Sequence, residues 1–334
     1  MKTLLTCLLI CTASWSQKTV FTVAFYNVEN LFDTIDQVDV WDDDRTPSGR
    51  YGNTKKVYNS KLNQIAKVIS EIGKDEVGQS PLILGLAEVE NFEVVYDLTQ
   101  TEYLKQQGYS IIHGDSPDKR GIDVALVYKN SSFFPSDFDF HELKIYGEDG
   151  QRIFTRNILE VRGFALGKPL VIFVNHWPSR RRGKLRSERL RIAASRLLIK
   201  KITLAQRELP KAQVILMGDF NDDPESLSIK TLSDSIPVLH NPYKRLAKMG
   251  VHSLVYRDAR NLFDQIILSS DFLEEGNKAL HLEAAKIFNP PELTLREGRF
   301  KGYPFRSYSF TNYTGGFSDH YPAYLILSVT NFEQ

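Results

Sequence analysis

Short apolar runs recur along the chain at a length typical of β-strands. Several are almost wholly apolar rather than alternating, as expected for strands that are buried on both faces. The runs lie at residues 20–25, 82–86, 124–128, 170–174, 214–217, 266–268 and 323–327. We expect each of them to form a strand inside the protein.

Helical patterns lie between these runs. Apolar residues recur every three or four positions in residues 61–72 and 187–201, which predicts two helices with one apolar face each. Ser187 is the expected N-cap of the second helix. Strands interleaved with helices indicate a layered α/β protein. Because no repeat and no flexible linker interrupts the series, we predict a single domain over residues 17–334.

The first sixteen residues carry a different pattern. Lys2 is followed by a short apolar stretch and then by small residues, the order of a cleavable signal peptide, and we expect cleavage near Ser16. Cys7 and Cys11 both lie in this segment, so the mature chain would contain no thiol or disulfide. A lipid anchor on one cysteine is the alternative. We therefore expect a secreted or periplasmic protein with no stable membrane association.

Charge is balanced over the whole chain but not within every segment. The 42 Lys and Arg residues against 41 Asp and Glu residues give a formal net charge of +1, so no general attraction to nucleic acid or membrane is implied. Aspartates crowd residues 33–44. They form either an accessory Ca²⁺ site or a solvated surface loop. Since the spacing lacks the EF-hand pattern and its closing glutamate, we favour the loop.

Polar residues stand at the ends of the predicted strands. Those that follow a strand are Asn27, Glu88, His176, Asp219 and Asn221, and those that precede one are Asp264, Asp319 and His320. Strand ends form a common rim in layered α/β proteins, where crevices open. Convergence on one rim requires the last two strands to run antiparallel to the others, which predicts mixed sheets. The carboxylates, amides and two histidines suit a hard divalent cation together with proton transfer.

Each of these residues also has a simpler interpretation when it is taken alone. Glu88 could cap a helix at residues 89–98, and Gly218, Asp219 and Asn221 are residue types that form turns. Asp123 opens a buried strand and could be a partner of His176, or it could be a surface residue near a turn. The repeated placement of polar residues at strand ends along the whole chain favours a shared site.

Five short motifs along the chain carry a family resemblance. They are Phe-Tyr-Asn-Val at 25–28, Leu-Ala-Glu-Val at 86–89, Asn-His-Trp-Pro-Ser at 175–179, Gly-Asp-Phe-Asn at 218–221 and Ser-Asp-His at 318–320. In this order they resemble the endonuclease/exonuclease/phosphatase, or DNase I-like, superfamily over about residues 20–328. The residues within these motifs are most similar to those of a branch of bacterial secreted or putative nucleases. The resemblance implies a four-layer α/β sandwich, in which two mixed β-sheets pack face to face and are flanked by helices.

The resemblance also implies hydrolysis of a phosphate ester assisted by Mg²⁺ or Mn²⁺. Glu88 takes the position of the principal metal ligand, and Asn27 and Asp319 lie where the family supports the metal or the phosphate. Asp219 and Asn221 match residues that position the nucleophile and bind phosphate. The family often has Gln before the metal-binding glutamate, whereas this chain has alanine there.

The same resemblance implies that two histidines take part in proton transfer and phosphate binding. His320 takes the position of the general base, and Asp264 that of the carboxylate that orients it. His176 matches a histidine that contacts the scissile phosphate, where a protonated ring would bind the phosphate or protonate the leaving group.

A basic run beginning four residues after His176 bears on the substrate. It comprises Arg180, Arg181, Arg182, Lys184, Arg186, Arg189 and Arg191, with only Glu188 opposing them. We expect Arg180 and Arg181 to grip phosphates that flank the scissile one, although such a run can also be a solvated helix face. A nuclease acting on DNA or RNA is the favoured function. The alternatives are a phosphatase or phospholipase C-like hydrolase of lipid-headgroup, inositol or sugar phosphates, and a non-catalytic binding protein. No protein partner is indicated.

Overall fold

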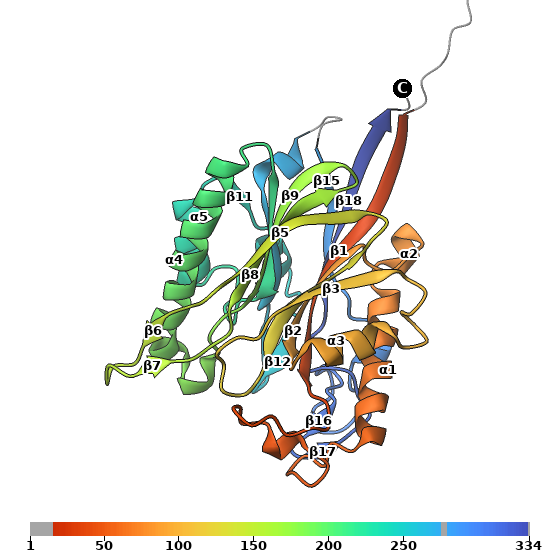
Figure 1. The fold of residues 1–334 in the computed structure, drawn as a ribbon, viewed down its shortest axis with the longest axis vertical. Coiled ribbons are helices and arrows are strands. Elements are labelled where there is room, and N and C mark those ends of the chain that lie inside the picture. Colours follow the sequence, from red (N-terminus) through yellow and green to blue (C-terminus); the bar gives the residue numbers. More distant parts are fainter. Residues whose placement is uncertain (1–15, 275–278, 333–334) are drawn as a thin grey trace, which may run out of the picture.

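The computed structural model describes residues 16–274 and 279–332, so both cysteines and nearly all of the expected signal peptide lie outside the described part. Two six-stranded sheets lie face to face at its centre (Figure 1). Sheet A has the order β15-β18-β1-β2-β4-β3, and sheet B has the order β11-β14-β10-β9-β8-β5. The strands of sheet A are β1 (Ser16–Leu31), β2 (Ile83–Val89), β3 (Tyr109–His113), β4 (Asp123–Lys129), β15 (His281–Ile287) and β18 (Ala323–Phe332). Those of sheet B are β5 (Phe133–His141), β8 (Ile158–Ala165), β9 (Lys168–His176), β10 (Gln213–Asp219), β11 (Leu239–His240) and β14 (Asp264–Ser269).

Helices cover the outer faces of both sheets, and short hairpins extend from the rims. Sheet A is flanked by α1 (Lys55–Glu71), α2 (Lys74–Val77) and α3 (Phe92–Thr99), and sheet B by α4 (Lys184–Glu208) and α5 (Leu227–Ser235) (Figure 1). The remaining helices are α6 (Tyr243–Lys248), η1 (Asp43–Arg45), η2 (Arg180–Arg182), η3 (Ser270–Leu273) and η4 (Pro291–Leu293). The hairpins are β6 (Ile145–Tyr146) with β7 (Arg152–Ile153), β12 (Leu254–Tyr256) with β13 (Ala259–Asn261), and β16 (Tyr308–Ser309) with β17 (Asn312–Tyr313). The expected four-layer α/β sandwich is confirmed.

Both sheets are mixed, as the strand-end pattern predicted. β1 pairs parallel with β2, and β9 pairs parallel with β10, whereas the other pairings in the two sheets are antiparallel. Every apolar run predicted as a strand lies in one of these strands or overlaps it. The parallel pairs carry their polar C-terminal residues to the same rim, which positions the site described below.

Burial on both faces explains why the central strands are apolar throughout. In β10, Ile215 and Met217 pack into the core between the sheets, whereas Val214 and Leu216 pack toward α4 and α5. The two sheets approach closely, because a Cβ added at Gly85 would lie 2.5 Å from the Met217 sulfur. A larger residue at position 85 would therefore require the Met217 side chain to shift within the core between the sheets.

The helix boundaries differ from the sequence prediction at their N-terminal ends. The prediction for α4 is wrong at Ser187, because the helix already begins at Lys184 and the Ser187 hydroxyl donates to the Gly183 carbonyl at 2.8 Å. α1 likewise begins at Lys55, six residues before the predicted start, with Thr54 accepting from the Val57 amide at 3.4 Å. The first residues of both helices, Lys55 and Lys56 in α1 and residues 184–186 in α4, are exposed and carry no apolar period that would mark the start of the helix. No helix in the described ranges is long and apolar enough to span a bilayer.

Candidate active site

The predicted site residues meet at one rim of the two sheets. Asp219 at the end of β10 lies opposite His176 of β9 and opposite Asp264 of β14. Asn27 of β1, in the other sheet, donates a hydrogen bond from its amide to Asp219 Oδ2 at 3.2 Å. Glu88 ends the neighbouring strand of sheet A, and its Oε1 lies 3.9 Å from His176 Nε2. Residues from both sheets therefore enclose one polar centre.

Local backbone geometry explains the Gly-Asp-Phe-Asn motif. A Cβ at Gly218 would lie 2.4 Å from the carbonyl oxygen of Asn175, so no other residue fits at this position. Asp219 Oδ1 accepts from the Asn221 amide at 2.9 Å, and Asn221 adopts a left-handed φ of 50°. The Asn221 side chain donates to the Trp177 carbonyl at 3.0 Å. The motif forms a tight turn that fixes an amide and a carboxylate beside β9.

Glu88 also occupies strained backbone. Its φ is 64°, although it lies within β2, and the strand pairings are irregular at this position. Such a conformation costs on the order of 1–3 kcal/mol and persists only where the surroundings impose it. The Glu88 side chain accepts from the Asn30 amide at 2.9 Å, which holds it at the rim. The helix after β2 is capped by Asn91 instead, so the alternative of Glu88 as a helix cap is wrong.

His320 and Asp264 form a buried pair. His320 Nδ1 lies 2.7 Å from Asp264 Oδ2, and Nε2 lies 4.0 Å from Asp219 Oδ2. Burial alone would lower the pKa of His320, but Asp264 and then Asp219 and Asp319 raise it well above its usual value. The Ser318 hydroxyl accepts from the His320 amide at 3.1 Å and donates to the Asn27 carbonyl at 2.7 Å. The Ser-Asp-His motif thus fixes the imidazole with Nε2 directed toward the centre.

His176 is buried in a different electrostatic environment. Its Nε2 lies 3.7 Å from Asp219 Oδ2. Burial lowers the pKa of His176 well below its usual value, and the cationic Arg156 and Arg120 lower it further. The ring is therefore neutral near pH 7 and carries one N–H. This favours a role as a neutral hydrogen-bond donor over the protonated form considered from the sequence.

Arg156 is a residue of the site that the sequence patterns did not reveal. Its buried guanidinium donates to the backbone carbonyls of His176 at 3.2 Å and Trp177 at 2.6 Å, and it pairs with Asp118 at 2.9 Å. Arg120 also pairs with Asp118, at 3.2 Å. Arg156 lies between two strands in a polar stretch that contains no sequence motif, so nothing in the sequence identified it as a residue of the site. It anchors the end of β9 and contributes positive potential at His176.

The site has the donor set expected for a divalent cation. Ligand atoms of Asp219, Asp264 and His320 lie within 4.8 Å of one another, and Asp264 Oδ1 is buried without a hydrogen-bond partner. Glu88 is close to this group and makes no ion pair with a lysine or arginine that the structure describes. Burial raises the pKa of Asp219, and the Asp264 and Glu88 carboxylates add to the rise against the opposing effect of His320. Unbalanced negative charge on oxygen ligands fits Mg²⁺ or Mn²⁺.

A sequence model of the Endonuclease/Exonuclease/phosphatase family matches residues 22–329. The chain belongs to this family. The resemblance inferred from the five motifs is thereby confirmed. Members of the family hydrolyse phosphoesters, so the chain is a phosphoester hydrolase rather than a non-catalytic binding protein. A comparison with curated protein sequences found no match.

Several solved structures share the fold of this family. An endonuclease/exonuclease/phosphatase family protein from Bacteroides thetaiotaomicron is 18% identical, with 94% of this chain and 97% of that chain covered and a TM-score of 0.58. Mannosyl-6-phosphatase from Bacteroides thetaiotaomicron VPI-5482 is 18% identical, with 92% and 99% covered and a TM-score of 0.56. D. rerio TDP2 complexed with single strand DNA product is 14% identical, with 92% and 98% covered and a TM-score of 0.58.

The two arginines proposed to grip phosphate have different environments in this family member. Arg180 donates to the Asn221 carbonyl at 2.8 Å and pairs with Asp222 at 2.7 Å and Asp223 at 3.2 Å. It is therefore committed to fixing the Gly-Asp-Phe-Asn turn, and the prediction that it grips phosphate directly is not supported. Arg181 is exposed and makes no ion pair with any residue the structure describes. Arg181 remains available for substrate.

Two further sequence interpretations are corrected. Asp123 pairs with His113 at 3.4 Å rather than with His176, because β3 pairs with β4 in sheet A and brings His113 to the start of β4. The acidic segment at 33–44 is not a wholly solvated loop, since Asp42 is buried and accepts from the Gln37 amide at 3.1 Å. Burial, with Asp33 and Asp42 nearby, raises the pKa of Glu90 to about 9. The accessory Ca²⁺ site at this segment stays a prediction.

Replacing the buried Arg191 should destabilise the segment that carries the site. Arg191 lies 2.7 Å from Asp222 and donates to the Ser187 hydroxyl at 2.7 Å, joining α4 to the turn after β10. Arg191→Leu removes one of the two cationic partners of the buried Asp222 and leaves Arg180 as the other, which should cost about 1–3 kcal/mol in the free energy of unfolding. Urea denaturation measures the change. Arg189→Leu, on the same helix but exposed, should change it by less than about 1 kcal/mol. Equal losses in the two variants would contradict a structural role for Arg191.

Proposed function

We propose that the chain is a secreted or periplasmic, metal-dependent phosphodiesterase that cleaves DNA or RNA, with one catalytic domain over residues 17–334. The observation that carries the proposal is the buried His320–Asp264 pair, whose free Nε2 faces Asp219 beside Glu88. This places a proton acceptor next to a cation-binding group of carboxylates, the combination that phosphodiester hydrolysis requires. Export is supported by the signal-like pattern of residues 1–16 alone.

Glu88 would hold Mg²⁺ or Mn²⁺, with Asp319 and Asn27 completing or supporting the site. When bound, the cation would polarise a phosphoryl oxygen and stabilise the negative charge that develops on the leaving oxygen. The protein's own side chains would act on the attacking water, the scissile phosphate and the leaving group.

In its neutral form, His320 would accept a proton from the attacking water at Nε2, and the carboxylates that raise its pKa also make it a stronger base. Asp264 fixes the tautomer that presents this nitrogen as an acceptor, and it stabilises the imidazolium that forms. The neutral His176 would donate its N–H to the phosphate, and the second N–H of the Asn221 amide is available for the same purpose. Asp219 orients Asn27 and Asn221 through the hydrogen bonds described above.

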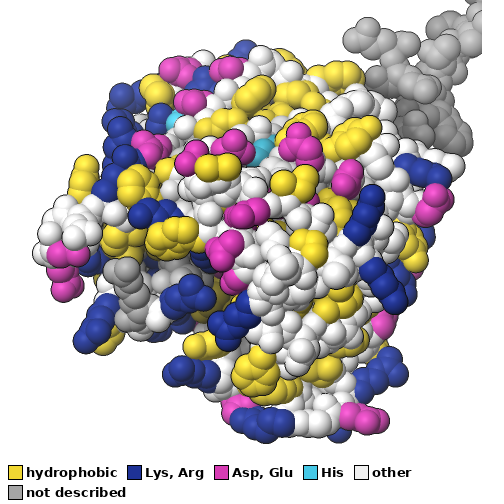
Figure 2. Space-filling model, turned by 60° about the horizontal axis from the view of Figure 1, so that its bottom comes forward, with side chains coloured by type: hydrophobic (Ala, Val, Ile, Leu, Met, Phe, Trp, Pro, Cys, Tyr) yellow, Lys and Arg dark blue, Asp and Glu magenta, His cyan; other side chains and the backbone are white. Residues whose placement is uncertain are grey.

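The basic side of the molecule supports a polyanionic substrate. Lys and Arg side chains gather along the side of the molecule that carries α4 (Figure 2). Arg181, Lys184 and Arg186 are exposed at the start of this helix, next to the loop that leaves His176. Positive side chains in this position can bind phosphates on either side of the scissile one. The D. rerio TDP2 structure with single strand DNA product shows that this fold can accommodate such a strand.

A sugar phosphate is the second candidate substrate. It is supported by the similarity in fold to the mannosyl-6-phosphatase from Bacteroides thetaiotaomicron VPI-5482, a bacterial protein of the same size range. The two candidates differ in their charge. A polynucleotide would contact several basic residues at once, whereas a sugar phosphate would contact only those at the scissile group.

A hydrolysis panel on the chain without residues 1–16 tests the proposed function. The substrates are single-stranded DNA, plasmid DNA, RNA, mannose 6-phosphate, inositol phosphates and sphingomyelin, each with Mg²⁺, Mn²⁺ or EDTA. We expect metal-dependent cleavage of nucleic acid that weakens steeply as salt rises, because each released counterion adds about one unit to the slope of log affinity against log salt. Hydrolysis of a small phosphate alone, at a rate that salt does not change, would show that nucleic acid is not the substrate.

A further inference from the structure

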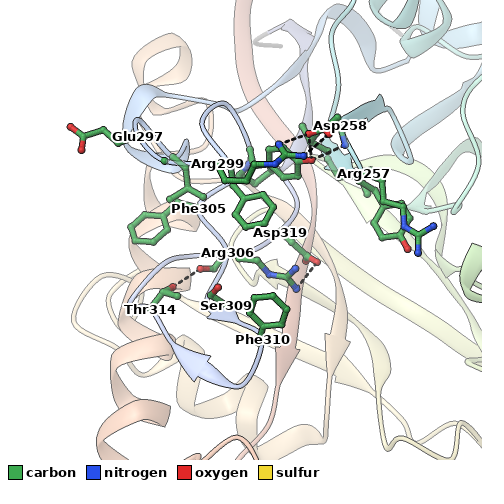
Figure 3. Close-up of a pocket in the computed structure, with 18 residues that line it drawn as sticks. Arg257, Asp258, Glu297, Arg299, Phe305, Arg306, Ser309, Phe310, Thr314 and Asp319 are labelled. Atoms are coloured by element: carbon green, nitrogen blue, oxygen red, sulfur yellow. Dashed lines mark hydrogen bonds and ion pairs between the residues drawn. The ribbon is translucent and has the colours of Figure 1, made fainter.

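We infer that a pocket beside the proposed reaction site binds the flat base of the nucleotide that carries the scissile phosphate. This inference rests on the proposed function and specifies its substrate. The pocket has a volume of about 860 Å³ and is built from the β12–β13 hairpin, the segment 295–306 and the β16–β17 hairpin. Asp319, the neighbour of the proposed general base, is part of its lining (Figure 3).

Arg306 forms the boundary between the pocket and the site. Its guanidinium donates to Glu29 Oε1 at 2.7 Å and to Asp319 Oδ2 at 3.2 Å (Figure 3). Glu29 is buried and is held in turn by the Ser307 amide at 2.7 Å. Asp319, which precedes His320, and Leu254, which forms an isolated backbone bridge with His320, both line the pocket, so the pocket adjoins the proposed reaction site. The pocket therefore suits part of the substrate and not a separate ligand.

Aromatic rings on three separate segments face solvent around the pocket. Phe310 is 86% exposed, and Tyr256 and Phe300 are 60% and 44% exposed. Phe310 also has a left-handed φ of 54° at the turn between β16 and β17. A non-glycine residue in this conformation costs roughly 1–2 kcal/mol, and an exposed ring recovers little of that cost by packing. An aromatic residue that stabilises neither its turn nor the core is well suited to stack on a ligand.

The polar groups of the pocket favour a base over a sugar. Arg299 is engaged by both oxygens of Asp258, at 3.1 and 2.8 Å, and the Tyr303 hydroxyl donates to the same carboxylate at 2.8 Å. Arg299, Asp258 and Tyr303 are thus paired with one another, and Arg306 is paired with Glu29 and Asp319. Few polar groups of the pocket therefore remain free to bind the hydroxyls of a sugar. Arg257 contacts the Tyr256 ring and makes no ion pair with any described residue. It can bind the next phosphate of a strand while the base stacks on an aromatic ring.

Phe310→Gly provides the test, because glycine adopts the left-handed turn without strain and should leave the chain folded. The probes are the dinucleotide TpT and its two analogues in which one base or the other is replaced by hydrogen. For the parent enzyme, we expect loss of one base to lower kcat/KM by about 5- to 100-fold, the range given by stacking on one aromatic ring. Phe310→Gly should lower kcat/KM for TpT by a similar factor and should reduce the preference for that base.

Controls separate this inference from the proposed function. Phe134→Ala removes another exposed phenylalanine, on β5 at the end of sheet B away from His176, and should leave kcat/KM unchanged. If the parent enzyme cleaves TpT and both analogues equally, the base pocket is overturned and the nuclease function stands. If it cleaves none of them and hydrolyses mannose 6-phosphate in a Phe310-dependent manner, both proposals fail and the pocket binds a sugar.

Discussion

Replacing His320 by alanine should lower kcat for phosphodiester hydrolysis by about 10²–10⁴-fold, the range typical of a lost general base. The expectation follows from the geometry of the pair. Asp264 lies 2.7 Å from Nδ1, so the imidazole is fixed with Nε2 toward the centre of the site, and no other described histidine has both a buried carboxylate partner and this orientation. Steady-state rates at saturating Mg²⁺ measure the change, and added imidazole should restore part of the activity.

A second buried histidine pair supplies the matched control for His320→Ala. His141 Nε2 lies 2.6 Å from Glu160 Oε2 in sheet B, on a strand two places from β9. His141→Ala removes the same kind of interaction from the fold without touching the site. We expect this variant to lose stability and to keep kcat within a few-fold of the parent. If His320→Ala also stays within a few-fold, His320 is not the general base.

The sequence was most informative where strands are buried on both faces. Strands such as β9 and β10 are continuous apolar runs, and their polar C-terminal residues mark the rim because parallel pairing carries both ends to the same side. Edge strands gave weaker signals. β5 is largely exposed, and its four phenylalanines are interrupted by Pro135, one serine and two aspartates, so its sequence has no continuous apolar run to identify it.

Pairings between distant polar residues could not be predicted from local patterns. Asp123 was interpreted either as a partner of His176 or as a surface residue, but it is buried against His113, which the pairing of β3 with β4 brings beside it. Arg180 stands four residues after His176 in the sequence, yet Asp222 holds its guanidinium. Arg156 and Phe310 had no motif at all, since one acts through backbone carbonyls and the other through an exposed turn. The reacting residues of the site could be predicted because they lie in short sequence motifs. The contacts that support them could not be predicted, because they depend on tertiary packing.

Glu88→Ala should abolish metal-dependent turnover, with a loss of roughly 10²–10⁴-fold, since a bound cation contributes several kcal/mol to stabilising the transition state. It should also abolish the effect of the metal on stability. Mg²⁺ or Mn²⁺ that binds only the folded protein stabilises it by RT ln(1 + [L]/Kd), so the melting temperature rises with the metal concentration. We expect this rise in the parent enzyme and not in Glu88→Ala, as measured by thermal denaturation with and without the metal.

The backbone at Glu88 makes this prediction more specific. Residue 88 keeps a left-handed φ of 64°, and its carboxylate lies near Asp219 and makes no direct ion pair with a described lysine or arginine. Removing that charge relieves repulsion with Asp219 but also loses the hydrogen bond from the Asn30 amide and the attraction to Lys61 and Arg306. The deciding quantity is therefore the metal-dependent rise in melting temperature, and not the stability in EDTA. Glu93→Ala, an exposed glutamate five residues further on, should retain both activity and the metal-dependent rise in melting temperature. A Glu88→Ala variant that is still stabilised by Mn²⁺ would place the metal on the Asp219, Asp264 and His320 side of the site instead.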